Sequence, residues 1–300
     1  MRPLRLYVFG SKGQVACSLR EAARDQSDIV ANFGGRPAVD IVHPDLVENA
    51  LQEFYPDIVV NAAAYTAVDR AESEPEVAFA TNRDGAGIIA AAAGRLDIPI
   101  LHLSTDYVFD GKKQSPYLET DATAPMNVYG QSKLEGELAV AAANERHLVL
   151  RTAWVYAPFG NNFVRTMLRL SKSHDKLKVV DDQIGCPTYA PDIAMTILSI
   201  ARMITHSGWR QEFSGVTHLA GPDEITWCAF AHRIMHALEQ NGQRSVPVEA
   251  IPTAAYPTAA VRPANSRLCC DRLASIFNIR MPTLEGSLKH CVARLLADQQ

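Results

Sequence analysis

The sequence predicts an α/β fold with a mostly parallel sheet and helices on both faces. Short apolar runs alternate with amphipathic segments of helical length through the first half of the 300-residue chain. A glycine-rich turn joins the first apolar run to the first helical segment. After about residue 155, prolines and glycines become frequent and the alternation weakens. These features indicate a sheet domain followed by a smaller lobe.

The expected elements of the first half follow one another in strand–helix order. The apolar runs predicted to be strands are residues 5–9, 29–32, 57–63, 99–104 and 147–154. The segments predicted to be helices are residues 14–23, 44–54, 75–95 and 132–143. This order predicts a Rossmann-like, doubly wound sheet, which binds ligands beyond the carboxyl ends of its strands.

The second half is expected to interleave with the first. Residues 1–155 are predicted to form an NAD(P)-binding domain, to which residues of about 180–220 return. Residues 156–300 are predicted to form mainly a substrate-binding lobe, with helices near 192–205 and 284–297.

Composition excludes several other classes of protein. The formal charge is −4 and no stretch is dominated by Lys and Arg, so we expect no nucleic-acid partner. No apolar run approaches the ~18 residues of a membrane span, and the apolar start is too short for a signal sequence. The six cysteines lack zinc-site spacing, which favours free thiols and a cytoplasmic location.

The glycine turn has the spacing G-x-x-G-x-x-A, with Gly10 and Gly13 before a helix that opens at Gln14 and Val15. A glycine turn at this junction lets a pyrophosphate approach the backbone and the positive end of the helix. Taken alone, a glycine pair after a strand is equally well explained as a plain turn.

Residues near the ends of the second and third strands bear on the cofactor. Asn32 stands where an acidic residue would favour NAD, and Arg36 follows it, so NADPH is preferred, with NADH as the alternative. Asp40 is placed to contact adenine. The small side chains from Asn61 to Ala63 and Ala64 either leave room for a cofactor or allow close helix packing.

Tyr129 and Lys133 are the candidate catalytic pair, because a spacing of four places them on one face of a helix. Tyrosine can donate a proton to a carbonyl oxygen while a hydride reaches its carbon. An ammonium at 4–5 Å would stabilise the phenolate by about 3–4 kcal/mol, which lowers the tyrosine pKa by roughly two units. Thr105, at the end of the fourth strand, would bond the same oxygen, although a turn cap is its simpler role.

Together these segments resemble extended short-chain dehydrogenases/reductases, and most closely the dTDP-4-dehydrorhamnose reductase family. The matching stretches, which span nearly the whole chain, are GSKGQVA, VVNAAAYTAVDRAESEP, NRDGAG, STDYVFDG, ETDATAPMNVYGQSKLEGE, LRTAWVYAPFGNNFV, VVDDQIGCPTY and RPANSRL. The resemblance implies NAD(P)H-dependent reduction of the C4 keto group of dTDP-4-dehydro-L-rhamnose, in surface polysaccharide synthesis.

The resemblance also assigns roles to individual residues. It implies that Tyr129 is the general acid, that Lys133 binds the cofactor ribose, and that Thr105 bonds the reacting oxygen. The residues implied to bind the cofactor are Gly13, Gln14, Val15, Asp40, Ile41, Ala64, Tyr65 and Thr66. The residues implied to line the substrate pocket are Thr105, Asp106, Trp154, Asn162 and Arg262. Without the resemblance, Trp154 would be assigned to the core.

Two alternatives accompany this hypothesis. In the first, the substrate is another dTDP-4-keto-6-deoxy sugar; in the second, the chain is a non-catalytic subunit resembling the regulatory β-subunit of methionine adenosyltransferase. Some family members dimerise through Mg²⁺ held by glutamates. Here Cys17 and Ser18 lie in the first helix and Pro191 replaces a later glutamate, so we expect no metal and a monomer or weak homodimer.

Overall fold

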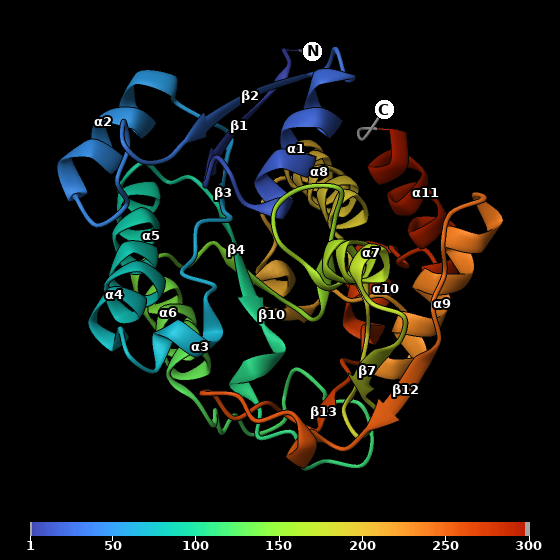
Figure 1. The fold of residues 1–300 in the computed structure, drawn as a ribbon. Helices are drawn as coiled ribbons and strands as arrows, with labels where there is room; N and C mark the ends of the chain where they lie inside the picture. Colours follow the sequence, from blue (N-terminus) through green and yellow to red (C-terminus); the bar gives the residue numbers. More distant parts are fainter. Residues whose placement is uncertain (1, 298–300) are drawn as a thin grey trace.

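The computed structural model describes residues 2–297 and is built around a six-stranded parallel sheet of order β10-β5-β4-β3-β1-β2 (Figure 1). Its strands are β1 (Leu4–Phe9), β2 (Ile29–Gly34), β3 (Ile58–Asn61), β4 (Ile100–Thr105), β5 (His147–Thr152) and β10 (Gly215–His218). Because β2 and β3 lie on opposite sides of β1, the strand order reverses between β1 and β3. Ligands bind at such a switch point in open α/β sheets. The predicted Rossmann-like fold is confirmed.

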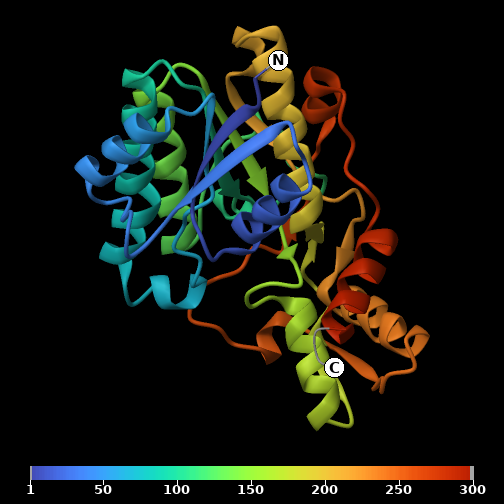
Figure 2. The same ribbon diagram turned by 90° about the horizontal axis from the view of Figure 1, so that it is seen from above.

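Helices cover both faces of the sheet (Figure 2). They are α1 (Gln14–Arg24) and α8 (Ala190–Ser207) on one face, and α2 (Pro44–Phe54), α5 (Ala86–Arg95) and α6 (Val128–Ala143) on the other. Alternate side chains of β1 serve the two layers: Leu6 and Val8 pack into the core with α1 and α8. Tyr7 and Phe9 pack into the core with α2 and α5. This two-sided burial explains why the strands are nearly continuous apolar runs.

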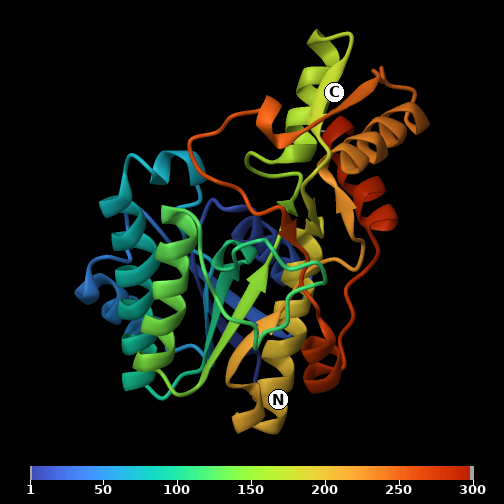
Figure 3. The same cartoon turned by 90° about the horizontal axis from the view of Figure 1, so that it is seen from below.

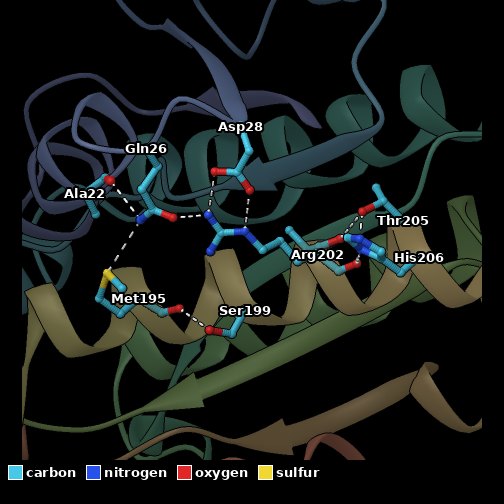
Figure 4. Close-up of polar contacts among 9 residues, drawn as sticks. Ala22, Gln26, Asp28, Met195, Ser199, Arg202, Thr205 and His206 are labelled. Carbon is cyan, nitrogen blue, oxygen red and sulfur yellow. Dashed lines mark hydrogen bonds and ion pairs between the residues drawn. The ribbon is translucent and has the colours of Figure 1, made fainter. Parts of the chain in front are cut away.

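Helix α8, which comes from the second half of the chain, is tied to the start of β2. Arg202 donates to both carboxylate oxygens of Asp28, over 2.8 and 2.9 Å, and also to Gln26 (Figure 4). The second half of the chain therefore supplies helix α8, strand β10 and the short helix α10 (Asp271–Phe277) to the sheet domain.

The segment predicted as one helix over 75–95 contains a wider turn. Helix α4 (Pro75–Phe79) runs into a π-helical turn, Ala80–Gly85, before α5 begins. Such turns insert one extra residue and often mark functional sites. Helix α6 packs so closely here that a Cβ atom at Gly136 would lie 2.0 Å from the carbonyl oxygen of Asn82.

Most of the remaining elements form a lobe with its own apolar core, beside the sheet domain (Figure 3). Its main parts are α7 (Phe163–Ser173), α9 (Trp227–Gln240), α11 (Leu284–Ala297), β7 (Leu177–Val180) and β12 (Val248–Ile251). The shorter elements of the lobe are β6 (Val155–Tyr156), β8 (Ile184–Gly185), β9 (Thr188–Tyr189), β11 (Ile225–Thr226) and β13 (Asn265–Ser266). The short helix α3 (Val68–Ala71) packs on α6 in the sheet domain. None of the described helices is both long and apolar enough to cross a lipid bilayer.

Candidate active site

The glycine loop lies at the switch point of the sheet. Gly10 has φ of +110°, and a Cβ atom there would lie 2.9 Å from the carbonyl carbon of Ala62. Its N–H donates to the carbonyl of Gly34 over 2.8 Å, so the ends of β1, β2 and β3 meet at this loop. Helix α1 begins at Gln14, with Gly13 as its N-cap and no side-chain cap. The free N–H groups of its first turn form a cradle that fits the pyrophosphate of a dinucleotide.

A cation at the end of β2 was missed by sequence reasoning. Arg20 of α1 donates to the carbonyl of Ser11 over 3.0 Å, and its guanidinium lies 4.5 Å from the ring centre of Phe33. It therefore lies between the glycine loop and the strand end that reads the adenosine ribose. Asn32 is exposed and its side chain accepts from the N–H of Phe33. The distance of twelve residues between Arg20 and Asn32 hid this arrangement in the sequence.

The predicted cofactor residues after β3 are held by the π-helical turn. Asn82 accepts from the N–H of Tyr65 over 2.8 Å and donates to Ser132 of α6 over 2.9 Å. The Tyr65 hydroxyl donates to Glu74 over 2.6 Å. Asn82 thus joins the loop of Ala63, Ala64, Tyr65 and Thr66 to the catalytic helix, and it is a second residue that sequence reasoning missed.

The two residues predicted to lie near adenine, Asp40 and Ile41, differ in how deeply they are buried. Ile41 is buried in the core beside Gly85, where a Cβ atom would lie 2.7 Å from the Ile41 side chain. Asp40 is half-buried, and its carboxylate accepts from the N–H of Val42 at a long 3.4 Å. Their contact with adenine stays a prediction.

The four residues nominated for catalysis and substrate contact near β4 are brought together and buried. Their exposed fractions are 9% for Tyr129, 2% for Lys133, 5% for Thr105 and 3% for Asp106. Tyr129 enters helix α6 two residues after its N-cap, Asn127, whose side chain accepts from the N–H of Gly130 over 2.7 Å. The end of β4 and the first turns of α6 therefore build one site.

Burial has the largest effect on the pKa of Tyr129. It raises the tyrosine pKa to about 12, with a smaller upward effect of Asp106, while a hydrogen bond with Thr105 lowers it. Lys133, which we expected from the sequence to lower this pKa, is not among the groups that shift it. The ammonium group of Lys133 instead donates to the carbonyl of Leu103 in β4 over 2.7 Å.

The pKa of Lys133 is also shifted from its ordinary value. Burial lowers its pKa to about 8, and the charge of Glu137, one turn further along α6, opposes this shift. Glu137 is engaged below the site: it accepts two hydrogen bonds from Arg151 and one from Ser104. The ammonium group of Lys133 therefore loses its proton more readily than that of an ordinary lysine.

Asp106 supplies a buried acceptor. One carboxylate oxygen accepts from Thr105 over 3.1 Å, and the Ser266 side chain lies near enough to lower the pKa of the group. The other oxygen, Oδ2, has no partner within 3.5 Å among residues 2–297. Burial raises the pKa of this carboxyl group to about 6. A buried acceptor without a partner indicates a place where a ligand hydroxyl would bind.

Trp154 follows β5 at the same edge of the sheet. It has φ of +46°, a strained value for an aromatic residue, and its indole stacks on Trp227 with 3.5 Å between ring centres. A Cβ atom at Gly185 would lie 2.4 Å from the indole, so this glycine makes room for it. The half-buried ring is fixed from two sides and packs against two apolar clusters, so its contact with substrate stays a prediction.

Asn162 and Arg262 already have protein partners. Asn162 is the N-cap of α7 and donates to the side chain of Gln14 over 2.9 Å, which joins the lobe to α1. Arg262 forms a bidentate ion pair with Asp69, at 2.8 and 3.2 Å. Their contact with substrate stays a prediction, and both residues link the lobe to the sheet domain.

Comparison with known proteins agrees with this geometry. The family model for the RmlD substrate binding domain matches residues 4–297. The chain belongs to this family. A dTDP-4-dehydrorhamnose reductase of Sinorhizobium fredii is 48% identical, with 98% of this chain and 99% of that protein aligned. That of Escherichia coli K12 is 38% identical over 97% of this chain and 98% of the relative.

Solved structures in the family have the same fold. The crystal structure of dTDP-4-dehydrorhamnose reductase from Bacillus anthracis in complex with NADP has a TM-score of 0.89 and 32% identity, covering 98% of this chain and all of that one. The predicted family resemblance is confirmed. UDP-glucose 4-epimerase from Brucella ovis, at 16% identity and a TM-score of 0.79, shares the fold.

Proposed function

We propose that this chain is an NADPH-dependent oxidoreductase that reduces the C4 keto group of dTDP-4-dehydro-L-rhamnose to give dTDP-L-rhamnose. The observation that carries the proposal is the buried group of Tyr129, Thr105 and Lys133 at the end of β4. It occurs in a chain nearly half identical to a protein named for this activity. A non-catalytic subunit would have no use for a buried tyrosine–lysine pair, so the regulatory alternative is not favoured.

The cofactor supplies the hydride. Gly10, Gly13 and the first turn of α1 would hold its pyrophosphate, because the start of α1 has no side-chain cap and Gly10 lets the loop pack against the backbone of Ala62. Arg20 would bind the 2′-phosphate that distinguishes NADPH from NADH. The NADP bound to the Bacillus anthracis relative supports this choice.

Tyr129 would donate its proton to the C4 oxygen as the carbonyl is reduced. A phenol with a pKa of about 12 is still more acidic than a secondary alcohol, so the transfer is downhill once the alkoxide develops. Thr105 bonds the phenol and steadies the phenolate that remains. The reaction consumes one proton per turnover, which the solvent must return to Tyr129.

The sugar would be held between the end of β4 and the lobe. The Oδ2 atom of Asp106 would accept from a sugar hydroxyl, and the part of the Trp154 indole that Trp227 and Gly185 do not cover would add apolar surface. Arg262 would bind the diphosphate of the substrate, which requires that its ion pair with Asp69 opens. We further infer a cytoplasmic monomer or weak homodimer; the six free cysteines fit a reducing compartment.

Turnover with a defined substrate tests the proposal. Purified protein is mixed with NADPH and dTDP-4-dehydro-L-rhamnose, prepared enzymatically, and the loss of NADPH absorbance and the product are recorded. Formation of dTDP-L-rhamnose supports the proposal. A faster reaction with another dTDP-4-keto-6-deoxy sugar would move the assignment to that sugar, and binding of both ligands without turnover would support the regulatory alternative.

A further inference from the structure

His102 lies beneath the catalytic lysine, in a position that the proposed mechanism does not use. It is fully buried on β4, directly opposite Asn61 in the β3–β4 ladder. Asn61 is 1% exposed. The Nδ1 atom of His102 lies 3.1 Å from the side-chain nitrogen of Asn61, and its Nε2 atom lies 3.5 Å from the Nζ atom of Lys133.

The surroundings of Asn61 fix the proton on the histidine. The side-chain oxygen of Asn61 accepts from the N–H of Ala63 over 3.1 Å, which orients the amide. Its NH₂ group, which can only donate, therefore faces Nδ1 of His102. Burial, followed by the charge of Lys133, holds the pKa of His102 well below its usual value, so the ring is neutral. A neutral ring that accepts at Nδ1 carries its proton on Nε2.

That proton points at the amine of Lys133. An ammonium group has only donors and repels an N–H, whereas an uncharged amine has a lone pair that accepts it. The other titratable groups around this part of α6 are Tyr129 and Glu137 on the helix, Asp106 after β4 and Arg151 on β5. Glu137 favours the charged lysine, but it is neutralised by Arg151 at 2.6 Å.

We propose that His102, oriented by Asn61, is a positioning residue that fixes the Lys133 amine against β4 and favours its uncharged form. This inference rests on the proposed function only in that Lys133 belongs to the proposed site. In this proposal, the buried His102 and Asn61 of the sheet make it easier for the Lys133 ammonium group to release its proton. A mobile proton one helical turn from Tyr129 is useful in a reaction that consumes one proton per turnover.

The state of the histidine can be read without any variant. In ¹⁵N-labelled protein, long-range ¹H–¹⁵N spectra distinguish the Nε2–H tautomer from the Nδ1–H tautomer and from the charged ring. We expect His102 to be the Nε2–H tautomer at every pH at which the protein is folded. A charged ring, or a proton on Nδ1, would overturn the proposal.

The effect on Lys133 is measured in protein labelled with [ε-¹³C]lysine, without cofactor or substrate. The Lys133 signal is assigned by its loss in Lys133→Met, and the exposed Lys289 serves as the internal reference. In His102→Phe, which keeps a ring of similar shape, we expect the titration midpoint of Lys133 to rise by about one pH unit or more. An unchanged midpoint in a folded variant would contradict the proposal, and this result does not depend on which sugar is reduced.

The kinetic counterpart separates positioning from simple structural support. In His102→Phe, the alkaline limb of the kcat profile should move upward by about the same amount as the Lys133 midpoint. A purely structural role would instead lower kcat by the same factor at every pH. Absence of turnover in the wild type would reject the proposed function and leave both NMR results valid.

Discussion

Glu137 and Arg151 form a buried bidentate ion pair beneath the catalytic helix, with N–O distances of 2.9 and 2.6 Å. Their side chains are 5% and 4% exposed. The pair joins α6 to β5, and Ser104 joins the same carboxylate to β4. The lysine and tyrosine of α6 are therefore positioned by charged contacts as well as by apolar packing.

Breaking this pair should cost more stability than a surface change on the same helix. Glu137→Gln leaves Arg151 buried without a counter-charge, so we expect a loss of about 3–5 kcal/mol in the free energy of unfolding. Glu135→Gln is the matched control, because Glu135 makes its ion pair at the surface and should cost less than about 1 kcal/mol. Urea unfolding of both variants measures the difference. Equal losses in the free energy of unfolding would show that the buried pair stabilises the fold no more than the surface pair does.

Two glycines of the cofactor loop should respond differently to alanine. Gly10→Ala is strained by φ of +110° and meets the backbone of Ala62, so we expect about 1–3 kcal/mol of destabilisation and loss of NADPH binding. At Gly13 the added carbon would keep 4.0 Å from the Ala62 oxygen and φ is −70°, so the fold should tolerate it. We expect Gly13→Ala to keep its melting temperature and bind NADPH more weakly. Normal NADPH binding by Gly10→Ala would exclude this loop as the phosphate site.

Arg20 should determine the preference for NADPH. Arg20→Ala removes a charged contact worth about 1.5–3 kcal/mol, so the KM for NADPH should rise about 10- to 100-fold while that for NADH changes little. Arg24→Ala, one turn further along α1 and exposed, is the control and should leave both values near those of the wild type. Equal changes for the two cofactors in Arg20→Ala would contradict a 2′-phosphate contact.

Asp106 should destabilise the ligand-free protein increasingly as the pH rises from about 4 to about 6, and by a constant amount above that. Its pKa is about 6 in the folded state and 3.8 ordinarily, so the folded state binds the proton more tightly and stability falls as pH rises between these values. The cost at pH 7 is about 3 kcal/mol. Asp106→Asn should therefore melt at a higher temperature than the wild type at pH 7, with the advantage lost near pH 4, and should bind the sugar more weakly.

Asp110 provides a control of opposite sign. A hydrogen bond from Tyr117 lowers the pKa of Asp110, so this carboxylate stabilises the fold at pH 7 and loses that effect in acid. Asp110→Asn should not raise the melting temperature at pH 7. A similar response of the two variants would mean that burial of Asp106 has no measurable cost.

The strands and most helices of the sheet domain were predictable, because strands buried on both faces read as apolar runs. Helix α6 begins at Val128, four residues before its predicted start. The capping residue Asn127 lies two residues after Pro125, and Gly130 follows within the first turn, which together hid the beginning of the helix. The π-helical turn at Ala80–Gly85 was beyond prediction, since one extra residue leaves the apolar pattern nearly unchanged.

The lobe and the supporting residues of the site were harder to predict. Helix α7 follows Asn162, which caps it, but the asparagine was interpreted only as a substrate residue. The contact of His102 with Asn61 depends on the register of two strands 41 residues apart in the chain. Tyr129, Lys133 and Thr105 could be found because their spacing and strand-end position are local. Their supporting residues come from separate segments and need the structure.

The measurement that tests the account most directly compares Tyr129→Phe with Tyr156→Phe in the NADPH oxidation assay with dTDP-4-dehydro-L-rhamnose. Tyr156 is the matched control: it is 1% exposed in the lobe core, and its hydroxyl has no partner among residues 2–297. We predict that Tyr129→Phe lowers kcat by about 10² or more while NADPH binding is kept, and that Tyr156→Phe stays near the wild-type rate. Turnover by Tyr129→Phe at close to the wild-type rate would contradict the assignment of Tyr129 as the proton donor.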